Sequence, residues 1–186
     1  MNRVDVRRVN ELNNFKYNGG SVLYWMQRDK RVSDNWALLY AQQLAIEKNS
    51  TLHVCFSLNG NFPKANVRQY SFMIHGLMET AQKLEELNIK FSLLIGDAKS
   101  SLPKFINDNS IGFVVTDFSP LRVYQKRTKS LSNSLNIPFH IVDAHNIIPI
   151  WEASEKQEFA AHTIRRKIHK KLDEYLTDFP PLMKQK

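Results

Sequence analysis

The chain has 186 residues, of which 42% are hydrophobic and 24% are charged, a composition typical of a globular protein. Its single cysteine excludes an internal disulfide, and no run approaches the roughly 18 apolar residues of a membrane-spanning helix. The net charge of +8 indicates either a basic soluble surface or a polyanionic partner such as nucleic acid. We expect a cytoplasmic protein with no membrane partner.

The first 20 residues are basic and lack an apolar stretch, so we expect an N-terminal arm and no secretory signal. Beyond this arm, short β-branched and aromatic runs alternate with longer segments of helical period. The predicted strands cover residues 21–27, 51–58, 89–96, 111–117 and 137–143, and the predicted helices cover residues 33–48, 66–87, 99–109 and 120–135. The strands are apolar almost throughout, which is typical of parallel strands covered on both faces. This order predicts an α/β fold with a doubly wound, five-stranded parallel sheet over residues 21–150.

The pattern changes after the last predicted strand. Residues 151–186 contain no further strand and are predicted to form a C-terminal helical linker, with a helix from about 154 to 176. The sequence FPP at 179–181 ends the helical pattern, because proline cannot continue a helix. The densest basic cluster of the chain, TIRRKIHKK at 163–171, lies in this linker. Three interpretations of this cluster stay open: a solvated helix face, a face that docks on another domain, and a direct contact with DNA.

In open α/β sheets, ligands bind outside the carboxyl ends of the strands, at the point where the strand order reverses. This rule indicates the loops at 27–35 and 117–122, which follow the first and fourth predicted strands. The sequence contains no G-x-G-x-x-G, G-x-x-x-x-G-K-[ST] or G-x-S-x-G motif, and its histidines lack metal-ligand spacing. We therefore expect no pyrophosphate cradle, no serine-hydrolase site and no metal site.

Residues 24–45, YWMQRDKRVSDNWALLYAQQLA, resemble the opening strand, loop and helix of the DNA photolyase/cryptochrome family. The matching residues are Trp25, Arg28, Asp29, Arg31, Asp34, Asn35, Ala37 and Leu38. Six later segments narrow the resemblance to class II cyclobutane pyrimidine dimer photolyases. They are LHVCFSL (52–58), VRQYSFMIHGL (67–77), LLIGDAKSSLPKF (93–105), VVTDFSPLR (114–122), VDAHNIIPIW (142–151) and ASEKQEFAAHTIRRKIH (153–169).

This resemblance implies the Rossmann-like N-terminal α/β domain of a deoxyribodipyrimidine photo-lyase, an enzyme that repairs cyclobutane pyrimidine dimers with light and reduced FAD. In the family, a larger helical domain follows and holds the FAD and most of the DNA-binding surface. We therefore expect no FAD site and no catalytic residue in this chain, which alone would be inactive. Its expected partners are that FAD-binding helical domain and, through the full-length enzyme, damaged DNA. The alternatives are a stand-alone nucleotide- or flavin-binding module for sensing or electron transfer, and an inactive remnant.

The resemblance also implies a light-harvesting role, because the N-terminal domain of many family members holds an antenna pigment, either a deazaflavin or a folate. Such a pigment needs a flat apolar slot and a few polar groups, which the strand ends can supply. The candidate pigment-binding residues are Met26, Gln27, Arg28, Phe56, Leu58, Arg68, Asp117 and Phe118. In this hypothesis Asp117 accepts hydrogen bonds from ring N–H groups, and Arg68 meets a carboxylate or hydroxyl.

Local chemistry gives four further expectations. Asp29 or Ser33 would cap the helix that starts near residue 34. Arg28 and Arg31 would pair with nearby carboxylates such as those of Asp34 or Asp117. Two interpretations of Trp25 stay open: a core residue of a central strand, which we favour, and a ring that stacks on the pigment at the mouth of the sheet. In the linker, Trp151 and Phe159 would lie exposed, because linkers of this kind pack on a partner domain.

Overall fold

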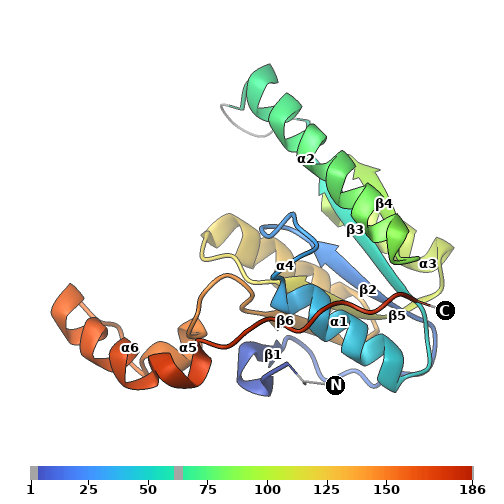
Figure 1. Cartoon of the computed structure of the whole chain (residues 1–186). Helices are drawn as coiled ribbons and strands as arrows, with labels where there is room; N and C mark the ends of the chain where they lie inside the picture. Colours follow the sequence, from blue (N-terminus) through green and yellow to red (C-terminus); the bar gives the residue numbers. More distant parts are fainter. Residues whose placement is uncertain (1–3, 61–64, 186) are drawn as a thin grey trace.

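A computed structural model describes residues 4–60 and 65–185 (Figure 1). One sheet forms its centre, with the strand order β1-β6-β5-β2-β3-β4. The strands are β1 (Val9–Glu11), β2 (Ser21–Met26), β3 (Leu52–Leu58), β4 (Lys90–Ile95), β5 (Ile111–Asp117) and β6 (Phe139–Val142). All five predicted strands are present and parallel, but the predicted strand count is wrong because β1 adds an antiparallel edge strand beside β6. With three residues and no apolar period, β1 carries no signal in the sequence.

Helices cover both faces of the sheet, which confirms the doubly wound α/β fold. They are α1 (Trp36–Glu47), α2 (Val67–Glu86), α3 (Ala98–Asp108), α4 (Arg122–Ser134), α5 (Ile150–Ala153) and α6 (Ala161–Tyr175), and a 3-10 turn spans Val6–Arg8. The α/β units match the predicted ranges closely, whereas the linker helix predicted at 154–176 consists of α5, a non-helical stretch and α6.

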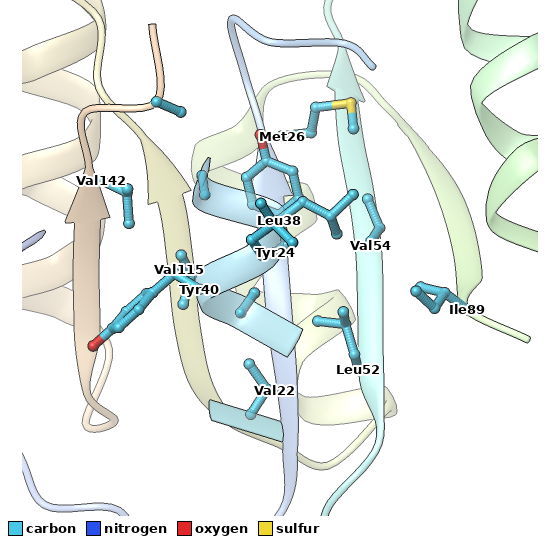
Figure 2. Packing of buried hydrophobic residues seen from close by; sticks show 14 of the residues in the cluster. Val22, Tyr24, Met26, Leu38, Tyr40, Leu52, Val54, Ile89, Val115 and Val142 are labelled. Atoms are coloured by element: carbon cyan, nitrogen blue, oxygen red, sulfur yellow. The ribbon is translucent and has the colours of Figure 1, made fainter. Parts of the chain in front are cut away.

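The core consists of two apolar layers that the alternation along β2 separates. Val22, Tyr24 and Met26 pack against α1 on one face, as Figure 2 shows, together with residues of β3, β5 and β6. Leu23 and Trp25 point to the opposite face, where they pack against α3 and α4. Every one of these β2 side chains is fully buried, including Trp25, as predicted for the core. Because β2 contributes to both layers, its carboxyl end is held firmly from both sides.

The start of α1 differs from the prediction that Asp29 or Ser33 caps it. Asn35 is the cap, and its side-chain oxygen accepts hydrogen bonds from the backbone N–H groups of Ala37 and Leu38, both at 3.1 Å. Asp34 immediately before it adopts a left-handed conformation with φ 53°, which turns the chain into the helix. The helix therefore begins at Trp36, and the backbone N–H of Asp29 bonds instead to Asp117.

The N-terminal arm packs against the α/β domain. Arg8 is only 2% exposed and donates to the carbonyl oxygens of Asn146 at 2.9 Å and Ile147 at 2.6 Å. Its guanidinium also lies 4.9 Å from the ring centroid of Trp36 and 5.5 Å from that of Tyr175. This one side chain therefore ties the arm to α1 and to the end of α6.

The segment after α6 returns along α1 (Figure 1). Phe179 stacks on Trp36 with ring centroids 4.2 Å apart, and Met183 and Gln42 exchange hydrogen bonds of 2.8 and 2.7 Å. Of the two linker aromatics expected to be exposed, Phe159 is 90% exposed, which confirms that prediction. Trp151 is half-buried, so its expected exposure is wrong, because its indole N–H donates to the Arg7 carbonyl and its ring contacts Phe118.

Candidate functional site

The reversal of strand order lies between β2 and β5, which pair in parallel at the centre of the sheet. From β2 the chain proceeds to β3 and β4 on one side, and from β5 it proceeds to β6 on the other. The two predicted loops, at 27–35 and 117–122, therefore leave the sheet next to each other at its carboxyl edge. A crevice at this position is the usual ligand site of such folds.

A cavity of about 440 Å³ opens at this edge, within the size range of small-molecule sites. Four of the predicted pigment-binding residues, Met26, Gln27, Phe56 and Leu58, line it. Among the described residues, the lining is Trp25, Met26, Gln27, Lys30, Phe56, Ser57, Leu58, Asn59, Ala65, Gln69, Tyr70, Met73, Tyr124 and Arg127. The strand ends of β2 and β3 thus form the floor of the cavity, and α2 and α4 supply its walls.

The α4 wall is a hydrogen-bonded polar and aromatic cluster. Arg127 donates through Nη2 to Oε1 of Gln27 at 2.5 Å, and its guanidinium lies over the rings of Trp25 at 5.2 Å and Tyr124 at 4.6 Å. Gln27 in turn donates to the hydroxyls of Thr116 at 2.8 Å and Thr128 at 3.2 Å, which fixes its amide. Burial lowers the pKa of Arg127 from its ordinary value, because the charged form loses water.

Lys30 supplies a second cation. Its ammonium lies 5.2 Å from the centroid of the Phe56 ring, and burial lowers its pKa while Asp117 and Asp29 oppose that shift. Among the described lining residues there is no carboxylate. The cavity therefore combines aromatic and apolar walls with two cations, which suits a flat ring whose edge carries acceptors or negative charge.

Asp117 lies beside the cavity but faces the loop backbone. Its carboxylate accepts hydrogen bonds from the backbone N–H groups of Gln27 at 2.7 Å, Arg28 at 2.5 Å and Asp29 at 2.9 Å. Burial raises the pKa of Asp117, and these three donors oppose the rise. The residue does not line the cavity, and both its oxygens accept hydrogen bonds from the loop after β2, so its binding of ring N–H groups stays a prediction that this geometry does not favour.

The other three predicted site residues also lie outside the lining. Phe118 contacts Trp151, with ring centroids 5.8 Å apart. Arg68 is exposed near the start of α2, and the next residue, Gln69, reaches the cavity in its place. Arg28 contributes its backbone N–H to Asp117, and the ion pairs of the described chain include neither Arg28 nor Arg31, so their predicted carboxylate pairing is wrong.

Sequence reasoning missed the cavity residues that helices supply. They are Gln69, Tyr70 and Met73 of α2, and Tyr124 and Arg127 of α4. A usable signal existed for α4, since it starts directly after the loop at 117–122 and its residues at positions 124 and 127 share one helix face. Lys30 also lay within the predicted loop. No group of three or more potential metal ligands occurs among the described residues.

Comparison with known proteins decides the family. The family model described as DNA photolyase matches residues 22–184. The chain belongs to the DNA photolyase family. It is similar over 98% of its length to a protein named deoxyribodipyrimidine photo-lyase from Potorous tridactylus, with 47% identity, and over 88% to one from Arabidopsis thaliana, with 46% identity. These matches confirm a photolyase N-terminal domain.

The photolyase chain spans about a third of these relatives, 35% of the Potorous protein and 33% of the Arabidopsis protein. Among solved structures, a bacterial class III photolyase from Agrobacterium tumefaciens superposes with a TM-score of 0.54 and 22% identity. That match covers 64% of this chain and 24% of the other, and it supports the fold alone. Among the helices of the described residues, none is long and apolar enough to cross a membrane.

Proposed function

We propose that this chain is the N-terminal antenna and structural domain of a class II deoxyribodipyrimidine photo-lyase. In its full-length form this enzyme would repair cyclobutane pyrimidine dimers in DNA with light and reduced FAD. Family membership and the one-third share of the two relatives support the proposal. The partner would be an FAD-binding helical domain, and damaged DNA would bind to the full-length enzyme. A cytoplasmic location agrees with the buried single cysteine.

The cavity at the carboxyl edge of the sheet carries the antenna part of this proposal. Its size and its walls fit a deazaflavin or a folate: Met26, Phe56 and Leu58 would contact the ring faces, and Gln27, Lys30 and Arg127 would face the polar edge. When bound, such a pigment absorbs light and passes the excitation energy to the flavin. The protein positions the ring, because Gln27 and Arg127 are already held by each other and by Thr116 and Thr128.

The experiment is an absorption and fluorescence titration of the purified chain with a deazaflavin and, separately, with a folate. We expect one of them to bind with a shifted absorption band, and we expect Phe56→Ala to weaken this binding more than the matched control Phe159→Ala. Phe159 is a suitable control because it is 90% exposed and does not line the cavity. Failure of both pigments to bind would overturn the antenna role.

A second assay tests whether FAD binding and dimer repair require the helical domain. The purified chain should contain no FAD and should not repair dimers under light. Light-driven repair by this chain alone would contradict the proposal. The alternative of a stand-alone nucleotide- or flavin-binding module predicts a wholly polar surface over 151–186, whereas Phe159 is 90% and Leu176 is 62% exposed.

A further inference from the structure

The helix α6 has two chemically different faces. It projects from the body next to α5, away from the sheet (Figure 1). Ile164, Ile168 and Leu172 are half-buried on its inner face. The side chains at positions 162, 165, 166, 169, 170 and 173 are exposed, and all of them are charged or histidine. This division follows the helical period, so the outer face is a continuous surface.

The lysines of the inner face are already neutralised. Lys167 pairs with Glu158, with Nζ and Oε1 2.6 Å apart, and Lys171 pairs with Glu152 at 3.4 Å. These two contacts hold α6 against the preceding linker segment. The inner cations therefore have a structural role and are not available to another molecule.

The cations of the outer face differ in this respect. Arg165, Arg166 and Lys170 are exposed, and none of them has an ion pair or hydrogen bond within the described chain. The only carboxylates of α6 are Asp173 and Glu174 in its last turn, and Glu174 pairs with Arg7 at 2.5 Å. The outer face thus presents concentrated positive charge with little compensation.

A protein partner does not suit this face well. Interfaces between proteins have apolar and aromatic cores from which lysine is depleted, and no large hydrophobic residue of α6 is exposed. The phosphate backbone of DNA has the complementary chemistry, because each strand carries one negative charge per about 3.4 Å of helix axis. Residues four apart on α6, such as Arg166 and Lys170, are separated by about 6 Å of rise, so their flexible side chains can contact successive phosphates.

We propose that the outer face of α6, formed by Arg165, Arg166 and Lys170, binds the phosphate backbone of duplex DNA without reading its sequence. The proposed function supplies only the identity of the polyanion, and the cavity has no part in this contact. The N-terminal domain would thereby add sequence-independent phosphate contacts to the DNA-binding surface of the full-length enzyme.

The test measures binding of the whole 186-residue chain to a short, undamaged, fluorescein-labelled DNA duplex by anisotropy across a range of salt concentrations. The variant carries R165Q, R166Q and K170Q. Each cation that neutralises a phosphate contributes about 0.9 to the slope of log Kobs against log salt. The variant should therefore lower the magnitude of this slope by about 2 to 3 and weaken binding at low salt.

The matched control removes three equal charges elsewhere, with K83Q, K99Q and K104Q on α2 and α3. These lysines are exposed, and α3 lies at the opposite end of the molecule from α6 (Figure 1). The control should change the slope by less than about 1, and circular dichroism should show both variants folded. An equal decrease in affinity and in salt slope for both variants would mean that net charge alone explains binding, and would overturn the proposal. Absence of salt-dependent binding, or equally tight binding of an acidic polyglutamate peptide, would overturn it as well.

Discussion

Replacing the buried Asp117 with asparagine should destabilise the domain and loosen the loop after β2. The carboxylate accepts three backbone N–H groups, one through Oδ1 and two through Oδ2, at distances of 2.5 to 2.9 Å. An asparagine has one acceptor oxygen, so at least one of these N–H groups loses its acceptor and faces an NH₂ group. Hydrogen bonds to charged groups contribute about 1.5–3 kcal/mol each. The lost hydrogen bond and the buried N–H group that it leaves unsatisfied outweigh the desolvation cost that is relieved with the buried charge, so we expect the free energy of unfolding to fall by about 2–4 kcal/mol.

Urea denaturation followed by circular dichroism measures this loss. The matched control is Asp108→Asn, because Asp108 is exposed at the end of α3, and its effect should stay within about 0.5 kcal/mol. Since Asp117 fixes the backbone that carries Gln27 and Lys30, the same variant should also weaken pigment binding. An unfolding midpoint equal to that of the unmodified chain, with an unchanged denaturant slope, would refute the idea that this carboxylate holds the loop.

Three further predictions concern packing and ionisation. Gly112→Ala should lower the free energy of unfolding by more than about 3 kcal/mol, because an added Cβ would lie 1.7 Å from the carbonyl oxygen of Gly19. Gly76→Ala, in open space on α2, should raise it by about 0.5–1 kcal/mol. Urea denaturation that finds equal stability for the two variants would contradict this prediction. A hydrogen bond and charge from Lys167 lower the pKa of Glu158 to about 2. The ion pair between Glu158 and Lys167 is therefore complete above the ordinary carboxyl pKa and is lost as the pH falls through about 2. Lys167→Ala should raise the pKa of Glu158 towards 4.5 in an NMR titration, and an unchanged pKa would contradict the ion pair. Burial raises the pKa of the Cys55 thiol, so a thiol reagent should react only after urea unfolds the chain, and rapid labelling of the native protein would count against the core packing.

The central fold was predictable from the sequence because its signals are local. The apolar run at 111–117 is typical of a strand covered on both faces of a parallel sheet, and every residue of β5 is buried. The additional strand β1 was not predictable, since its pairing with β6 depends on residues more than a hundred positions away. The return of the last residues along α1 depends similarly on the distant contact between Phe179 and Trp36.

The candidate site was predictable in position and only half predictable in composition. Topology alone indicated the edge of the sheet and the strand-end residues Phe56 and Leu58. It did not indicate whether a charged residue faces the ligand or its own backbone, and Asp117 shows how a carboxylate at the right position satisfies the main chain instead. The place of α4 after the loop at 117–122 indicated which helix face meets the site, but the burial of Arg127 was not predictable, because it depends on the rings of Trp25 and Tyr124 that cover the guanidinium.

The attachment of α6 has a mechanical consequence. The segment that carries this helix is attached to the domain at both ends. At its start, the carboxylate of Asp143 accepts a hydrogen bond from the Ile150 N–H at 2.8 Å. At its end, Tyr175 lies against the guanidinium of Arg8 and Phe179 stacks on Trp36. We expect the two fragments produced by a single proteolytic cleavage between these contacts to stay associated until denaturant separates them. For the same reason, we expect α6 to move together with the rest of the domain rather than independently of it.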